Sequence, residues 1–138
     1  MLVDAFGELN WLAVIVAGLA YYALGAVWYT NLLFGRQYRT ALGLDPAEQA
    51  QPNPTLLGVN LVGWLLASLA LALVVVGIDA DGLVDGVVVG LVAGIGMVAT
   101  HQVVNAVYDG SNRALLRIHV PYTIIGFTLM GAILAMWR

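Results

Sequence analysis

Long apolar stretches separated by short polar segments dominate the chain. Each stretch reaches or exceeds the roughly 20 apolar residues that a helix needs to cross the hydrocarbon core of a bilayer. None shows the strict apolar–polar alternation of a half-buried strand, and backbone groups in lipid must find partners within their own segment. The pattern therefore predicts four membrane-spanning helices, at about residues 9–34, 56–78, 84–108 and 116–137.

The segments between these stretches are short, so consecutive spans should run antiparallel. The expected fold is all-α, an integral membrane four-helix bundle with up-down topology, in which residues 1–138 form a single transmembrane domain. In the first connection, Asp45 is a suitable N-cap and Pro46 a suitable first helical residue. A short interfacial helix is therefore expected at residues 46–51.

Composition agrees with a protein whose main partner is the lipid bilayer. Hydrophobic residues make up 62% of the chain and charged residues 9%, against about 25% charged in soluble domains. A net charge of −3 without any basic run argues against a nucleic-acid partner. The absence of cysteine and lysine excludes disulfides, thiolate metal sites, cysteine nucleophiles and Schiff-base lysines.

The arginines predict how the chain is oriented. Arg36 and Arg39 follow the first span, and Arg113 and Arg117 follow the third, whereas Arg138 alone lies on the other side. Short connections rich in arginine stay in the cytoplasm. Both of these connections should therefore be cytoplasmic, and the N- and C-termini should lie outside. That outer side carries the acidic residues Asp4, Glu8, Asp79, Asp81 and Asp85.

Glycines recur every fourth residue along the third span and form what we call the glycine seam, Gly82, Gly86, Gly90 and Gly94. Small residues allow helix backbones in a membrane to approach closely. The main interpretation is close packing against another helix, and a sliding surface is the alternative. The pattern leaves open whether the neighbour belongs to the same chain, to a second copy in a homo-oligomer or to another membrane protein.

Polar side chains gather toward the predicted cytoplasmic ends of all four spans. On an ideal helical wheel His101 lies within about 20° of Gly90 and Gly94, so it should continue the glycine seam and face protein. The predicted polar cluster and candidate ligand-binding site consists of Tyr29, Asn60, His101, Asn105, His119 and Tyr122.

This cluster has four interpretations. It could join helices by hydrogen bonds, bind a solute or an ion, bind a lipid or quinone head group, or hold a metal or haem. Two histidines without cysteine or a nearby carboxylate pair make a poor zinc site, and histidines on adjacent helices are too close to hold a haem between them. We therefore predict no metal site and no catalytic residues, and the cofactor stays unknown. An enzyme is the least supported class, since no nucleophile–base pair is visible.

The segments "NWLAVIVAGLAYYALGAVWYTNLLFGRQYRTALG" and "MGAILAMWR" resemble an uncharacterised bacterial family of small membrane proteins, domain of unknown function 1761. The resembling features are the Trp28–Tyr29 pair before "LLFGR", the glycine-rich third span and the closing tryptophan and arginine. The resemblance extends over nearly the whole chain. It implies four spans and a bacterial inner membrane, and it implies no activity.

Two functions follow from these patterns. The first is a protein that binds or permeates a small solute or ion through the cytoplasm-side polar cluster. The second is an accessory or scaffold subunit that packs through the glycine seam in a homo-oligomer or a larger membrane complex. Polar residues from all four spans at one depth favour the first, because helix–helix packing alone does not require them.

Overall fold

The fold was analysed in a computed structural model, which describes residues 1–47 and 53–138, and every regular element in those ranges is helical. In chain order the elements are α1 (Leu2–Ala5), η1 (Phe6–Glu8), α2 (Trp11–Trp28), α3 (Gly35–Ala41), α4 (Pro54–Gly77), α5 (Gly82–Leu91), η2 (Val92–Ala99), α6 (Thr100–Asp109) and α7 (Arg113–Met136).

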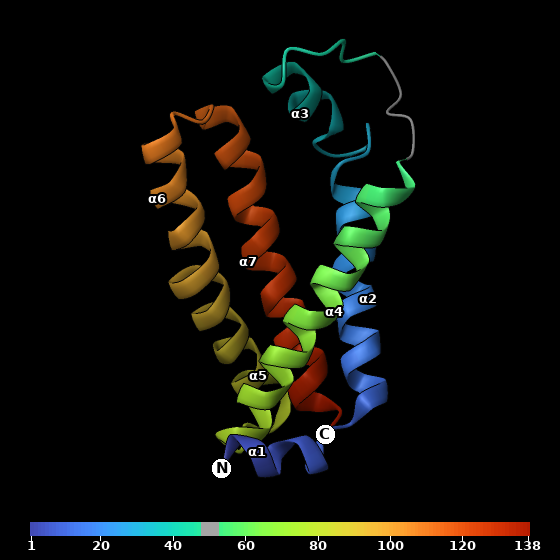
Figure 1. The fold of residues 1–138 in the computed structure, drawn as a ribbon, viewed down its shortest axis with the longest axis vertical. Coiled ribbons are helices and arrows are strands. Elements are labelled where there is room, and N and C mark those ends of the chain that lie inside the picture. The colour runs from blue at the N-terminus through green and yellow to red at the C-terminus, as the bar shows by residue number, and fades with distance from the viewer. Residues whose placement is uncertain (48–52) are drawn as a thin grey trace.

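The prediction of an all-α bundle with four spans is confirmed. Four helices are long and apolar enough to cross a membrane, and the third of them combines α5, η2 and α6 (Trp11–Trp28, Pro54–Gly77, Gly82–Asp109 and Arg113–Met136). The chain is therefore a multi-pass membrane protein. Both termini lie at one end of the bundle, and α3 and the α6–α7 turn lie at the other (Figure 1). We call these the terminal end and the α3 end.

Asparagine side chains mark the beginnings of three spans. Asn10 accepts a hydrogen bond from the Ala13 N–H at 3.1 Å, and Asn53 and Asn112 cap α4 and α7 in the same way. An N-cap oxygen satisfies a backbone donor that has no partner within the helix. These caps fix the starts of the spans at Trp11, Pro54 and Arg113. The predicted starts were residues 9, 56 and 116.

The first span ends earlier than predicted, at Trp28. The Thr30 hydroxyl donates to the Val27 carbonyl at 2.6 Å, and such side-chain bonds compete with helical ones. The chain then turns into α3, so the short helix of this connection lies at residues 35–41. A helix was expected at residues 46–51. Pro46 and Ala47 form a turn, and residues 48–51 lie outside the described residues.

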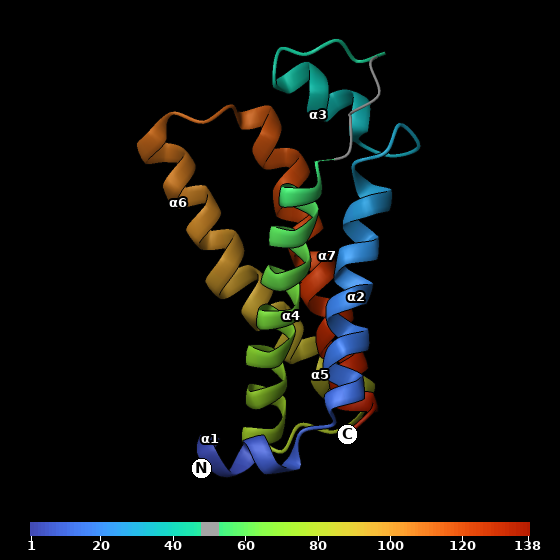
Figure 2. The same cartoon turned by 45° about the vertical axis from the view of Figure 1, so that its right-hand side comes forward.

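Helix α7 is the centre of the bundle. It packs along α5 and η2 on one side and along α2 and α4 on the other, whereas α4 and α5 hardly contact each other. Toward the α3 end, α6 leans away from α4 in both views (Figures 1 and 2). The core around α7 is filled by side chains, and Tyr21 and Met130 are fully buried.

Three of the four seam glycines pack against α7 of the same chain. A Cβ atom at Gly86 would overlap the carbonyl oxygen of Gly131, one at Gly90 would overlap that of Phe127, and one at Gly94 would lie 3.0 Å from the Phe127 Cβ. Gly82 was wrongly placed on this surface. It starts α5 with a φ of +78°, and no described atom lies within 4 Å of its Cβ position, so it forms the turn rather than the helix contact.

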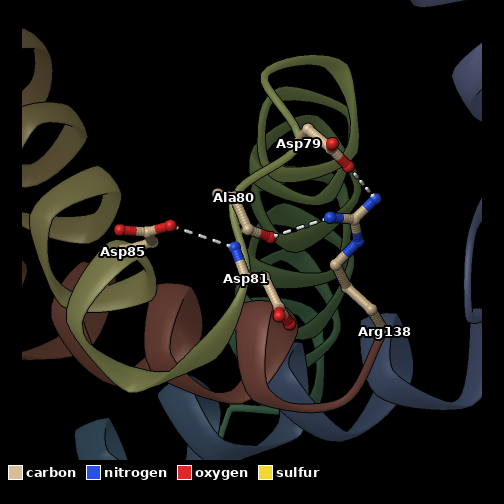
Figure 3. A network of polar contacts seen from close by, with 5 residues as sticks. All are labelled: Asp79, Ala80, Asp81, Asp85 and Arg138. Carbon is tan, nitrogen blue, oxygen red and sulfur yellow. Dashed lines mark hydrogen bonds and ion pairs between the residues drawn. The ribbon is translucent and has the colours of Figure 1, made fainter.

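At the terminal end, a polar network fastens α7 to the α4–α5 turn (Figure 3). The Arg138 guanidinium lies 2.9 Å from the Asp79 carboxylate and donates to the Ala80 carbonyl at 3.1 Å. The Asp85 carboxylate accepts the Asp81 N–H at 3.2 Å. Asp79 is largely exposed, and exposed ion pairs contribute about 0–1 kcal/mol to stability. The network therefore orders this turn more than it stabilises the fold.

Candidate functional site

Three of the predicted cluster residues come together between α2 and α7. The Tyr29 hydroxyl lies 2.5 Å from Nδ1 of His119, and the Tyr29 ring meets the Tyr122 ring edge-on at 5.4 Å between centroids. Tyr38 of α3 packs edge-on against both Tyr29 and His119. The two tyrosines at the end of α2 and in α3 thus hold the imidazole in place.

An aromatic core extends this group into the bundle. Trp28 donates from Nε1 to the Ile118 carbonyl at 3.1 Å, and Tyr21 stacks on Trp64 with 4.0 Å between ring centroids. Tyr21 also meets Tyr122 edge-on. Sequence reasoning did not include Tyr38, which contacts His119, or Trp28 and Trp64, which contact Tyr122. Trp28 directly precedes the predicted cluster residue Tyr29, whereas Tyr38 lies in the connection between the first two spans.

The other three predicted cluster residues lie elsewhere. His101 and Asn105 are exposed on α6 and bond to each other, with 2.9 Å between Nε2 and Nδ2. Asn60 is exposed on α4. A single polar cluster drawn from all four spans is therefore not what the structure contains. It contains a Tyr29–His119–Tyr122 group inside the bundle and a second set of polar side chains on its surface.

The π-helical segment η2 accounts for this difference. The Thr100 N–H donates to the Ile95 carbonyl, five residues back, where an α-helix would use the residue four back. One such insertion rotates all following residues by about 100° relative to an ideal α-helix. His101 therefore points away from α7. The residue after it takes the position against α7 that the sequence predicted for His101.

That next residue is Gln102, which sequence reasoning also missed. Its Nε2 donates to the Thr123 hydroxyl of α7 at 2.9 Å, and that hydroxyl lies 3.3 Å from the Gln102 Oε1. Thr123 is buried and Gln102 is half-buried. The only signal in the sequence was its position beside His101, because nothing in the residues of η2 marks a π-helix in advance.

A lateral groove separates α4 from α5 and η2. Its volume is about 370 Å³, and its walls are apolar side chains of both helices with Phe127 of α7 at the base. Taking about 30 Å³ per group, as for a water molecule, the groove has room for roughly a dozen methylene groups. Its lining residues are Ala67, Ala70, Leu71, Val74, Ile78, Val88, Val89, Val92, Ala93, Met97 and Phe127.

The exposed polar side chains lie on the extension of these walls toward the α3 end. On α4, Asn60 is seven residues before Ala67, and on α6, His101 and Asn105 are four residues apart. Residues at these spacings share a helix face. The face that is apolar in the groove thus becomes polar as α4 and α6 diverge (Figure 2).

The polar side chains also share one depth in the membrane. Asn60 lies 17 residues before Gly77, the end of α4, and His101 and Asn105 lie 19 and 23 residues after Gly82, the start of the third span. These separations bracket the roughly 20 residues that cross the hydrocarbon core. The third span has 28 residues in all, so its last turns extend beyond that core. His101, Asn105 and Asn60 are therefore placed near the boundary between hydrocarbon and head groups.

Comparison with known families decides where this chain belongs. A family model described as "Protein of unknown function (DUF1761)" matches residues 12–135. The chain belongs to the DUF1761 family. This confirms the resemblance found in the sequence. Neither the curated proteins nor the solved structures contain a match to the chain.

The DUF1761 match covers α3, α4, α5, η2 and α6 entirely and nearly all of α2 and α7. It therefore includes the Tyr29–His119 pair, the groove and the polar residues beyond it, whereas Arg138 lies outside it. Within residues 1–47 and 53–138 of this DUF1761 protein, no three His, Asp or Glu side chains gather in a way that could hold a metal ion. The lateral groove offers space for a ligand within the described part of the fold.

Proposed function

We propose that this protein binds an uncharged, single-chain amphiphile from the bilayer in the lateral groove. The chain of the amphiphile lies between α4 and α5–η2, and its polar head lies at Asn60, His101 and Asn105. The observation that carries this proposal is the apolar groove between α4 and α5–η2, together with exposed polar side chains farther along α4 and α6, near the depth where a lipid changes from apolar to polar.

The polar residues need a partner at this depth. A neutral imidazole has one donor and one acceptor, and an asparagine amide has two donors and an oxygen acceptor. The bond between His101 and Asn105 uses only one nitrogen of each side chain. A head group with hydroxyl or carbonyl oxygens at this boundary could hydrogen-bond to the remaining donors and acceptors.

Selectivity should come from the head and not from the chain. Lipid tails are as apolar as the groove, so moving a chain from the bilayer into it gains little free energy. Each hydrogen bond between membrane-embedded groups contributes about 0.6–2 kcal/mol, which corresponds to roughly 3- to 30-fold in affinity. The groove is lined by apolar side chains, and this favours an uncharged head because a charged one would find no counter-charge there.

The other two functions have less support. Passage of a solute through one copy would have to displace the fully buried Tyr21 and Met130. A scaffold that packs through the glycine seam would need a free seam, and Gly86, Gly90 and Gly94 are covered by α7. A partner subunit remains compatible with the exposed face of α6, where a second copy could satisfy His101 and Asn105, and the experiment below separates that case.

Photolabelling tests the proposal. The probe is a monoacylglycerol with a diazirine in its chain, added to the protein in phosphatidylcholine nanodiscs. We expect labelled residues on the facing sides of α4 and α5–η2, and competition by unlabelled monoolein. The variant Ala67→Leu/Ala93→Leu fills the groove and should lower labelling at least fivefold, because leucines occupy the space of the chain.

Ala23→Leu/Ala26→Leu is the matched control, since both alanines are exposed on α2 and neither lines the groove. It should label like the wild type. Labelling spread evenly over exposed faces, including Ile15 and Leu19, would contradict the proposal. Competition by oleate as strong as that by monoolein would contradict an uncharged head. Exclusion of the probe from the wild type, together with dimers on chemical crosslinking, would show that a second copy covers the groove.

The proposed location is a bacterial inner membrane, with both termini outside and the α3 end in the cytoplasm. Arg36 and Arg39 lie in α3, and Arg113 and Arg117 lie in the first turns of α7. Both elements are at the α3 end of the bundle (Figure 1), and an excess of arginine next to the span ends marks the cytoplasmic side. A C-terminal alkaline phosphatase should be active and a C-terminal green fluorescent protein dark. Reporters inserted after Ser111 should behave in the opposite way, and fluorescence at the C-terminus would refute this orientation.

A further inference from the structure

The π-helical segment η2 is unusually long. It covers the eight residues Val92–Ala99, whereas π-helices usually occur as single-turn bulges, often at functional sites. The Ile95 carbonyl accepts two hydrogen bonds from Thr100, one from its backbone N–H and one from its hydroxyl at 2.8 Å. The Thr100 side chain thus bonds to the same carbonyl, five residues back, as the Thr100 backbone does, and this supports the π-helical register.

The effect of η2 can be followed on the face of the third span that packs against α7. The residues on this face are Gly86, Gly90, Gly94, Ala99, Gln102 and Ala106. The steps between them are four residues except for a step of five inside η2 and the step of three that follows it. In a continuous α-helix the face would continue from Gly94 to Val98, His101 and Asn105.

Both registers offer a hydrogen-bonding partner to the same buried group. In the π-helical register Gln102 bonds to the Thr123 hydroxyl. In the α-helical register His101 would occupy the position of Gln102, and an imidazole can also donate to or accept from a hydroxyl. Two neighbouring residues that can each satisfy Thr123 make a two-state element possible, because neither state leaves the buried hydroxyl without a partner.

The surroundings of α6 allow such a rotation. Within the described structure α6 packs on α7 and adjoins η2, and most of its side chains are exposed. The turn that follows contains Gly110 with a φ of +70° and exposed residues on both sides. A change of one residue in register would lengthen the helix by about 1.5 Å, which this turn can absorb.

We infer that η2 is a register switch for the groove. When η2 is π-helical, His101 and Asn105 face the groove; when it becomes α-helical, they turn onto α7 and the groove loses its polar end. This inference rests on the proposed function. A ligand that binds only the first arrangement must shift the population toward it, so an amphiphile in the groove stabilises the π-helical register.

Disulfide trapping can read the register directly, because the chain has no cysteine of its own. The pair Gln102→Cys/Thr123→Cys reports the π-helical register, and the pair His101→Cys/Thr123→Cys reports the α-helical register. Val103→Cys/Thr123→Cys gives the background, since Val103 faces α7 in neither register. In phosphatidylcholine nanodiscs we expect the 101/123 pair to form at least threefold above background, and monoolein to lower its yield by at least threefold.

A deletion of Gly96 provides the structural control. Gly96 lies within η2, with no described atom within 4 Å of its Cβ position, so its removal should be tolerated. With one residue fewer, a continuous α-helix would keep Gln102 on Thr123, and the 101/123 pair should fall to background.

The outcomes separate the switch from the binding proposal. If the 101/123 pair never exceeds background while photolabelling still finds the groove, the switch is wrong and the binding proposal stands. If both pairs form but monoolein changes neither, control of the register by the groove ligand is overturned. If photolabelling fails as well, the proposed function falls independently of the register.

Discussion

Gly90→Leu should lower the free energy of unfolding by more than about 3 kcal/mol. Inserting bulk into a packed core usually costs 1–3 kcal/mol, and here even a Cβ atom at Gly90 would overlap the Phe127 carbonyl oxygen and approach the Thr128 Cα at 2.6 Å. These are backbone atoms, which cannot rotate away as a side chain can. The leucine therefore has to push α5 and α7 apart along their closest contact.

The measurement is unfolding in mixed micelles with increasing sodium dodecyl sulfate, followed by circular dichroism. Gly63→Leu is the matched control, since Gly63 lies in the middle of α4 with no described atom within 4 Å of its Cβ position. It should leave stability unchanged or raise it by up to about 1 kcal/mol through better helix propensity. Equal losses for the two variants would show that the α5–α7 contact does not limit stability.

The glycine positions also give a graded series. Alanine at Gly94 would place its Cβ 3.0 Å from the Phe127 Cβ, so a small shift of one side chain relieves it. The loss should therefore be smaller than for Gly90→Ala, where backbone atoms are met. This gradation explains why the sequence could predict that the third span packs on another helix but not how closely. The four-residue spacing identifies the contacting face. The distance between the helices depends on the backbone of the neighbouring helix.

The four spans could be predicted because apolar length is a property of each segment by itself. The cap residues Asn10, Asn53 and Asn112 were readable in principle and would have set the helix starts more closely. The end of the first span was missed since the apolar run continues past Trp28, and the Thr30 hydroxyl bond that ends the helix leaves no trace in hydropathy.

The candidate site was predicted correctly only for residues whose direction did not have to be calculated along many turns of a helix. Tyr29 and His119 lie near span ends, and their contact depends on antiparallel topology alone. His101 and Asn105 were placed by counting at 100° per residue through η2, and the π-helical register displaced them by one residue. An error in register does not decay along a helix, so His101 and Asn105 of α6 were both assigned to the wrong face.

Tyr21 is the residue whose loss should do the most damage to the α2–α4–α7 packing. It is fully buried, stacks on Trp64 of α4 and meets Tyr122 and Phe127 of α7 edge-on. A Cβ atom at Gly126 would overlap its ring, so α7 carries a glycine where the tyrosine sits. The ring thereby joins three helices at one point.

Tyr21→Ala should lower the free energy of unfolding by about 3–5 kcal/mol, because truncating a buried aromatic residue leaves a cavity and removes its ring contacts. Tyr21→Phe keeps the ring and should retain stability to within about 1 kcal/mol. Tyr108→Ala is the control for a tyrosine that is 88% exposed, and its effect should stay below about 0.5 kcal/mol. The same titration with sodium dodecyl sulfate measures all three.

Tyr21→Ala should also affect the groove, although Tyr21 does not line it. Trp64 stacks on Tyr21 within 11° of parallel, and the stack fixes α4, which forms one wall of the groove. Photolabelling of α4 should therefore become weaker and more dispersed in Tyr21→Ala and stay normal in Tyr21→Phe. A loss in Tyr21→Phe as large as in Tyr21→Ala would assign the role to the hydroxyl group and not to the ring.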